Sequence, residues 1–301
     1  MRLRWAPLVA ALALVMSAVA AGQPATVDPA SLMTSPVVLL NGARDVSQGT
    51  GFFFASTLPD GTPDTVFLVT NYHVVAGHAP GTNATRGGDR IRFSLHEDPE
   101  DLSKNRGIEL RLYDEQDLPI WVASNDVPAA DVVLVPLPRA SYAGIRLFVF
   151  TEAHTRGDIR IRPTSGATLL GYPYGFYDTL HRLPVWKTGH IASEPSVDFE
   201  GRPVFLVDVS AFPGMSGSPV LAVANGIYES EDGVMRSGRV LKLLGIFSSM
   251  PVARQAGRVD ASDPAARPAP IETSLQLGYV WKAALIADLA RGGGGGRIRS
   301  E

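Results

Sequence analysis

The sequence is built from short runs of apolar and β-branched residues, separated by segments rich in Gly, Pro, Asn and Asp. The clearest runs lie at 52–55, 65–70, 91–95, 108–112, 131–135, 167–170, 186–193, 203–208, 220–223 and 240–248. Short runs bounded by turn-forming residues are typical of β-strands. The sequence has neither an alternation of strands with long helical patterns nor an internal repeat. It therefore predicts a mostly antiparallel all-β fold of two packed barrels or sandwiches.

A helical pattern closes this series of strands. From Leu277 to Leu289 the apolar residues have helical spacing, which predicts a C-terminal helix. Residues 140–165 carry no strong strand pattern and are expected to form the crossing between two halves. We therefore expect a first β lobe over 35–150 and a second over 151–290 that includes the helix.

Both ends of the chain are expected to lie outside the two lobes. Residues 22–34 are small and polar and predict a flexible N-terminal tail. Residues 291–301 include five consecutive glycines and predict a flexible C-terminal tail.

The first residues have the composition of a secretory signal peptide. Arg2 and Arg4 supply positive charge, an apolar run follows from Leu8 to Ala20, and Ala18-Val19-Ala20 fits a small-x-small cleavage site. We assign the signal peptide to residues 1–21, with an uncleaved N-terminal anchor as the alternative. A secreted or periplasmic bacterial protein is expected, without stable membrane insertion once the leader is cleaved.

Composition excludes several classes of function. The 301 residues carry a formal net charge of -3, so the basic signature of nucleic-acid binding is absent. The sequence has no cysteine, which excludes disulfides, a thiol nucleophile, zinc–thiolate sites and a lipid-modified cysteine. It has no cofactor fingerprint and no metal-ligand motif, so we expect neither a cofactor nor a metal.

The strongest chemical motif is Gly214-Met215-Ser216-Gly217-Ser218-Pro219. Glycines on both sides of a serine allow a sharp turn that exposes the hydroxyl and aims backbone N–H groups at one point. A nucleophile beside such donors is what acyl transfer requires. The alternative is an ordinary Gly/Ser/Pro turn between strands.

A serine nucleophile needs a general base and an orienting carboxylate. His73 is the candidate base among the six histidines, because it follows directly on a buried strand. Asp131 is the candidate carboxylate, because it begins an apolar strand and a buried carboxylate needs a partner. Asp126, in the more solvated turn before it, is the alternative.

The order of these residues resembles that of the chymotrypsin/trypsin-like serine peptidases. Within them the chain is similar to the bacterial, cysteine-free branch that includes HtrA-like and glutamyl-endopeptidase-like enzymes. The motifs that carry the resemblance are Gly49-Thr50-Gly51-Phe52, Thr70-Asn71-Tyr72-His73-Val74-Val75, Asp131-Val132-Val133-Leu134, the Ser216 motif and Gly245-Ile246-Phe247-Ser248. The resemblance implies two packed antiparallel six-stranded β-barrels with a C-terminal helix, and a polypeptide substrate.

The resemblance also implies a role for each residue. Ser216 would attack the scissile carbonyl, His73 would take its proton, and Asp131 would orient His73. The backbone N–H groups of Gly214 and Ser216 would form the oxyanion hole. The walls of the primary specificity pocket would come from Ser210, Ala211, Ser248 and Ser249. Because no acidic residue lies at its base, small or medium apolar substrate side chains are expected.

The sequence departs from the family pattern in two places. Met215 replaces the acidic residue with which zymogen-activated members bind a new N-terminus, so activation by that ion pair is excluded. The chain after the predicted helix is short, so no PDZ module is expected.

Other interpretations of the sequence stay open. A catalytically inactive binding protein on the same fold is the alternative function. An α/β-hydrolase esterase is disfavoured, because the serine lacks the strand–elbow–helix context of that class. The aromatic segment from Gly171 to Asp178 predicts either a packed corner, which we favour, or a substrate-facing loop.

Overall fold

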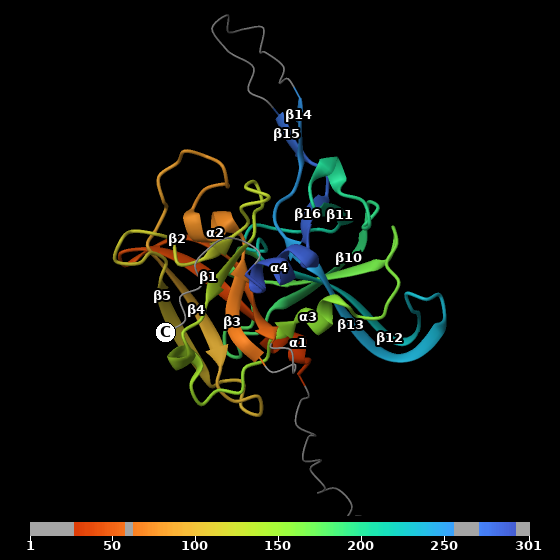
Figure 1. Ribbon diagram of the computed structural model, residues 1–301, viewed down its shortest axis with the longest axis horizontal. Helices are drawn as coiled ribbons and strands as arrows, with labels where there is room; N and C mark the ends of the chain where they lie inside the picture. Colours follow the sequence, from red (N-terminus) through yellow and green to blue (C-terminus); the bar gives the residue numbers. More distant parts are fainter. Residues whose placement is uncertain (1–26, 58–62, 256–270, 293–301) are drawn as a thin grey trace, which may run out of the picture.

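The computed structural model describes residues 27–57, 63–255 and 271–292. These residues form two β lobes that lie side by side, with β1–β5 in one and β9–β13 and β16 in the other (Figure 1). The predicted signal peptide and the last nine residues of the predicted C-terminal tail lie outside the described residues.

The first lobe is a sheet of eight strands. These are β1 (Thr34–Asn41), β2 (Arg44–Thr57), β3 (Pro63–Thr70), β4 (Arg90–His96), β5 (Asn105–Arg111), β6 (Val122–Ala123), β7 (Val133–Pro136) and β8 (Phe150–Thr151). The strand order is β5-β4-β1-β2-β3-β7-β6, and β8 pairs with β2. All pairings are antiparallel except that of β8. The lobe thus has eight strands where six were expected.

The second lobe is a closed barrel in the order β10-β11-β16-β13-β12-β9. Its strands are β9 (Gly166–Gly171), β10 (Val185–Ile191), β11 (Val204–Asp208), β12 (Pro219–Glu229), β13 (Met235–Phe247) and β16 (Leu277–Lys282). All six pairings in this ring are antiparallel. The predicted fold class, mostly antiparallel β with a small C-terminal helix, is confirmed.

The helices are short. They are α1 (Pro29–Leu32), α2 (Tyr72–Ala76), α3 (Glu152–Thr155) and α4 (Ala283–Ala290), with 3-10 turns η1 (Arg139–Tyr142), η2 (Pro173–Gly175) and η3 (Phe199–Gly201). Among the described residues, no helix has both the length and the apolar character needed to cross a membrane.

The predicted C-terminal helix starts later than expected. Residues 277–282 form β16, and only Ala283–Ala290 are helical. This strand pairs with β11 on one side and with β13 on the other, so it closes the barrel. The gain of two ladders of backbone hydrogen bonds outweighs the local helical spacing of the side chains.

The predicted N-terminal tail is also shorter than expected. Asp28 caps α1 by accepting from the N–H of Ala30, and Pro29 occupies the first turn. Ala30 and Leu32 are buried, and β1 begins at Thr34. The last residues of the segment 22–34 are therefore part of the packed fold, because their apolar side chains find partners in both lobes.

The alternation of β2 explains how one strand serves two cores. Phe53 and Ala55 face the core of the first lobe, whereas Phe52 and Phe54 face a cluster shared with the second lobe. Successive side chains of a strand point to opposite faces, so a continuous apolar run is buried on both sides. We call the shared set the interlobe cluster; it includes Phe52, Phe54, Val69, Leu134, Phe150, Leu170, Leu221, Leu243, Ile246, Trp281 and Ile286.

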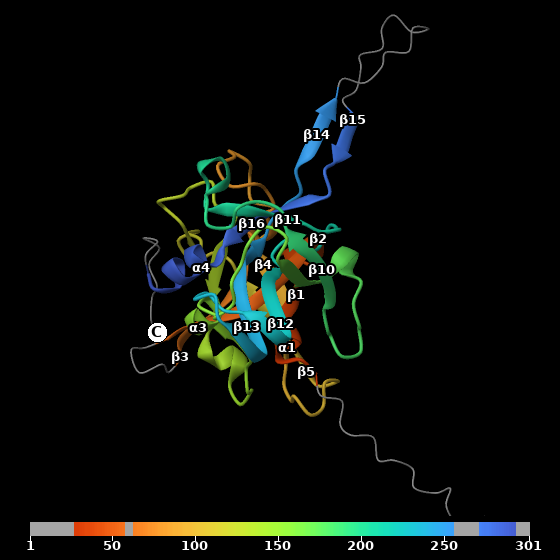
Figure 2. The same cartoon turned by 90° about the vertical axis from the view of Figure 1, so that its right-hand side faces the viewer.

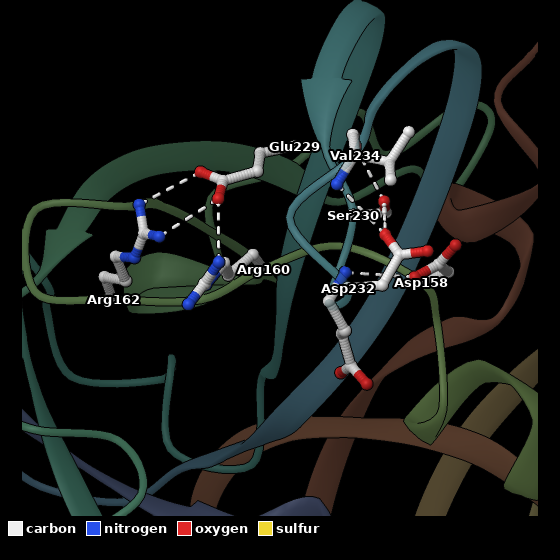
Figure 3. Close-up of polar contacts among 8 residues, drawn as sticks. Asp158, Arg160, Arg162, Glu229, Ser230, Asp232 and Val234 are labelled. Atoms are coloured by element: carbon white, nitrogen blue, oxygen red, sulfur yellow. Dashed lines mark hydrogen bonds and ion pairs between the residues drawn. The ribbon is translucent and has the colours of Figure 1, made fainter.

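The strand after Ser216 runs into a long hairpin, β12–β13, whose far end is held by polar contacts (Figure 3). Glu229 accepts from Arg160 at 2.9 Å and from both terminal nitrogens of Arg162 at 3.0 Å. In the turn, the Ser230 hydroxyl donates to Val234 O at 2.7 Å.

A second antiparallel pair of strands, β14 (Val252–Gln255) and β15 (Ile271–Ser274), projects away from the two lobes (Figure 2). It follows Ser249 in the chain.

Candidate active site

His73 lies in the single turn of α2, directly after β3. Asn71 precedes the helix with an extended backbone, and Gly77 ends it in the left-handed conformation with its N–H bonded to His73 O. The turn packs through Val74 and Val75 against the first-lobe core. The imidazole therefore projects from a short, well-anchored element, with its side chain 33% exposed.

Asp131 is buried just before β7 and receives three hydrogen bonds. The N–H of His73 donates to Oδ1 at 3.0 Å, and His73 Nδ1 lies 2.7 Å from Oδ2. The Ser248 hydroxyl donates to the same Oδ2 at 2.6 Å. An ionised carboxylate only accepts hydrogen bonds, so this geometry assigns the imidazole proton to Nδ1 and leaves the Nε2 lone pair free.

The environment of Asp131 favours its charged form. Burial raises the pKa of this carboxyl, but the hydrogen bond and charge of His73 and the Ser248 hydroxyl outweigh it and hold the pKa below the ordinary value of 3.8. Asp131 is therefore ionised at neutral pH. The alternative carboxylate, Asp126, is exposed, and no hydrogen bond or ion pair joins it to His73.

Ser216 lies on the loop between β11 and β12, where two glycines have positive φ. Gly214 has φ +93° and Gly217 has φ +91°. A Cβ on Gly217 would lie 1.9 Å from Thr50 O, and one on Gly214 would lie 2.5 Å from Tyr172 O. Glycine is therefore required at both positions, for backbone conformation and for space.

Ser248 connects the three candidate residues. Its hydroxyl contacts Asp131, and its carbonyl accepts from Ser216 Oγ at 2.9 Å. The Ser216 hydroxyl thus points at Ser248 O, and no hydrogen bond joins it to His73 in the described chain. From the sequence, Ser248 is expected only in the wall of the specificity pocket. Its contact with Asp131 had no local signal, because it depends on how the end of β13 lies against the residues before β7.

The backbone of the Ser216 loop leaves two N–H groups unpaired. The N–H groups of Met215, Gly217 and Ser218 donate to Phe212 O, Phe247 O and Met215 O. Within this described loop, from 214 to 218, only the N–H groups of Gly214 and Ser216 have no hydrogen-bond partner. Buried backbone donors are normally satisfied, so two free N–H groups between bonded neighbours indicate a place for an acceptor.

The peptide between Pro213 and Gly214 is held in a defined orientation. Met215 N–H donates to Phe212 O at 3.0 Å, with Pro213 and Gly214 at the central positions, as in a type II turn. Pro213 O accepts from Tyr174 N–H at 2.6 Å. The C=O and N–H of a trans peptide point in opposite directions, so the Gly214 N–H points away from Tyr174.

The remaining predicted pocket residues differ in exposure. Ser210 and Ser249 are exposed, whereas Ala211 is buried with Met215 in the core of the second lobe. Met215, which is fully buried, thus packs in an apolar cluster. The structure describes no group of three or more His, Asp or Glu side chains arranged to hold a metal ion.

The aromatic segment 171–178 is packed at its start and exposed further on. Tyr172 is buried, its hydroxyl lies 3.2 Å from the Thr34 hydroxyl, and burial raises its pKa. Tyr174 and Phe176 are exposed, and the Tyr174 ring lies 5.8 Å from that of Phe212. The segment is therefore a packed corner at its start and an exposed loop beside the Ser216 turn further on.

Comparison with known proteins gives one family and several similar structures. The family model of the trypsin-like peptidase domain matches residues 49–227. The structure is similar to the serine endoprotease from Yersinia pestis, with 15% identity and a TM-score of 0.43 over 88% of this chain and 65% of that chain. It is also similar to a catalytically inactive tobacco etch virus protease complexed with substrate, with 11% identity and a TM-score of 0.39 over 74% of each chain. No curated protein matches the sequence.

Proposed function

The chain belongs to the family of the trypsin-like peptidase domain, and from this premise we propose that it is a serine endopeptidase acting through an acyl-enzyme intermediate. The observation that carries the proposal is the pair of unpaired N–H groups, Gly214 and Ser216, on the loop that bears the Ser216 hydroxyl. The His73–Asp131 pair, joined to Ser216 through Ser248, supplies the base that such a hydroxyl needs.

In the proposed mechanism Ser216 turns from Ser248 O toward His73. Nε2 of His73 takes the hydroxyl proton while Oγ attacks the scissile carbonyl, and the imidazolium is stabilised by ionised Asp131. The carbonyl oxygen, now negative, accepts from the N–H groups of Gly214 and Ser216. His73 then protonates the leaving amine, and a water molecule hydrolyses the acyl-enzyme by the same steps.

The finer parts of the proposal come from the sequence. The composition of residues 1–21 supports export to the periplasm or the medium. Ser210, Ala211, Ser248 and Ser249 are proposed to line a pocket without charge, which favours small or medium apolar side chains of a polypeptide substrate.

One observation favours the alternative, an inactive binding protein on the same fold. The Ser216 hydroxyl donates to Ser248 O and not to His73. A site locked in this state would bind a peptide without cleaving it. The two functions differ in whether Ser216 is an activated nucleophile.

Labelling with a fluorophosphonate probe distinguishes them. We expect the wild type to be labelled and Ser216→Ala and His73→Ala to lose labelling, because the reaction needs both the hydroxyl and its base. Asp131→Asn should lower kcat on a peptide substrate by roughly 10⁴-fold, since an amide stabilises the wrong tautomer of His73.

His78→Ala is the matched control, because this histidine makes hydrogen bonds to Ala79 and Thr82 and a ring contact with Tyr72, and none of these contacts involves a candidate catalytic residue. It should be labelled like the wild type. A folded wild type that the probe does not label would overturn the peptidase proposal and favour the binding protein.

A further inference from the structure

Thr50 forms hydrogen bonds with the Ser216 loop through both its backbone and its side chain. It is fully buried in β2 between Gly49 and Gly51. Its N–H donates to Ser216 O at 2.8 Å, and its hydroxyl donates to Gly214 O at 2.8 Å. The same hydroxyl accepts from Tyr172 N–H at 3.2 Å.

These contacts surround the two free N–H groups. Gly214 O and Ser216 O belong to the residues whose N–H groups are unpaired, and Thr50 binds both carbonyls. The Gly214 N–H lies in the peptide after Pro213 and the Ser216 N–H in the peptide after Met215, so Thr50 binds the peptide that follows each donor and not the one that carries it. Thr50 therefore fixes the backbone on the C-terminal side of both donor residues, whereas the peptide that carries the Gly214 N–H is held through Pro213 O.

The hydroxyl also acts on the peptide that carries the Gly214 N–H, through the segment 172–174. By accepting from Tyr172 N–H, it fixes the start of the segment whose Tyr174 N–H holds Pro213 O. That last bond orients the Gly214 N–H. One hydroxyl thus acts directly on Gly214 O and, through the 172–174 segment, on the peptide before it.

The backbone of Thr50 is held in turn. Thr50 O accepts from the Thr70 hydroxyl at 2.7 Å, at the end of the strand that leads to His73. A Cβ on Gly171 would lie 3.0 Å from Thr50 Oγ1, so the neighbouring strand leaves the hydroxyl little room to move. The contact is rigid, as positioning a catalytic group requires.

We propose that Thr50 is a positioning residue whose hydroxyl, through Gly214 O and through the 172–174 segment, holds the Gly214 N–H in its donor orientation before substrate binds. The kinetic consequence rests on the proposed peptidase function, whereas the effect on the loop does not. Threonine acts here as a donor and an acceptor at once, so valine, which has the same shape, removes both bonds. Serine keeps both.

The test compares Thr50→Val with Thr50→Ser, in the full chain, by hydrogen exchange and by steady-state kinetics. In Thr50→Val we expect peptides covering 212–218 to exchange faster, because the bonds of the Met215, Gly217 and Ser218 amides open more often. We expect kcat to fall about 10- to 100-fold, which is no more than the fall caused by removing a whole oxyanion donor. KM should stay within about twofold of the wild-type value. Thr50→Ser should stay near wild type in both measurements.

Thr155→Val is the control for the loss of a threonine hydroxyl. Its hydroxyl donates to Glu152 O at 2.8 Å within α3, away from the Ser216 loop. It should change neither kcat nor exchange of 212–218. If Thr50→Val does not fold, Thr50→Ala takes its place, and if neither folds while Thr50→Ser does, the hydroxyl supports the whole fold and the proposal is wrong.

The two proposals fail in different ways. An active wild type with Thr50→Val unchanged in kcat and in exchange would overturn the role of Thr50 and leave the peptidase standing. A wild type without labelling or hydrolysis would overturn the peptidase, and exchange of 212–218 would still decide whether Thr50 holds the loop.

Discussion

His96, at the end of β4, makes one of the polar contacts between the two lobes. Its Nε2 lies 2.7 Å from His181 O, in the segment that follows η2, and only 8% of the residue is exposed. Because the carbonyl only accepts, Nε2 carries the proton. Burial lowers the pKa of His96 from 6.5, although the bond to His181 O opposes this effect.

This lowered pKa predicts how stability depends on pH. Above about pH 6.5 His96 is neutral in both the folded and the unfolded chain, and its contribution to stability is fully present. As the pH falls below 6.5, the unfolded state binds a proton that the folded state resists, so the free energy of unfolding decreases. We expect His96→Gln to be less sensitive to pH between about 7.5 and 5 than the wild type in urea unfolding.

His78→Gln is the control, since the hydrogen bonds of His78 stay within its own loop. It should keep the pH dependence of the wild type. Part of that dependence should persist in His96→Gln, because burial also lowers the pKa of His154. A slope in His96→Gln equal to that of the wild type would show that His96 titrates alike in both states.

At the scale of single elements, α4 connects the C-terminus to both lobes. Ile286 is fully buried in the interlobe cluster, whereas Ala284, on the same helix, is exposed. Removing buried methylene groups costs their transfer free energy and adds a cavity. We expect Ile286→Ala to lower the free energy of unfolding by about 2–5 kcal/mol.

Ala has a higher helix propensity than Ile, so the loss in Ile286→Ala cannot come from propensity. Ala284→Ser tests whether any substitution in α4 lowers stability. An exposed substitution in the same helix should change stability by no more than about 0.5 kcal/mol. Equal losses in both variants would show that α4 contributes through its helical structure and not through the interlobe cluster.

The elements also show which features a sequence can predict. Strands such as β2 and β7 were recognisable because their continuous apolar runs reflect burial on both faces. The contact of His73 with Asp131 followed from one residue at a strand end and another at a strand start. Both inferences use local signals.

Features that depend on long-range pairing were not predictable. The boundary between β16 and α4 is set by the strands on either side of β16, and the packing of α1 is set by partners in both lobes. The contacts of Ser248 with Asp131 and Ser216, and those of Thr50 with Gly214 and Ser216, arise only when residues far apart in the chain meet.

At the scale of the whole molecule, the two lobes share more than a surface contact. The interlobe cluster takes Phe52 and Phe54 from the first lobe and Leu170 and Leu221 from the second. The candidate site is divided in the same way, because His73 and Asp131 belong to the first lobe and Ser216 to the second. If one lobe unfolded alone, half of the interlobe cluster would become exposed, and His73 and Asp131 would be separated from Ser216.

We therefore expect the lobes to unfold together. In native-state hydrogen exchange at increasing urea, the most protected amides of β4 and of β9 should reach the same free energy of opening. The reason is that unfolding either lobe exposes the interlobe cluster. Ile286→Ala should lower that common value equally in β4 and β9, although α4 follows the second lobe in the chain. Separate free energies for the two strands, or a loss confined to β9, would show that the lobes are independent units and that the candidate site is assembled only by their docking.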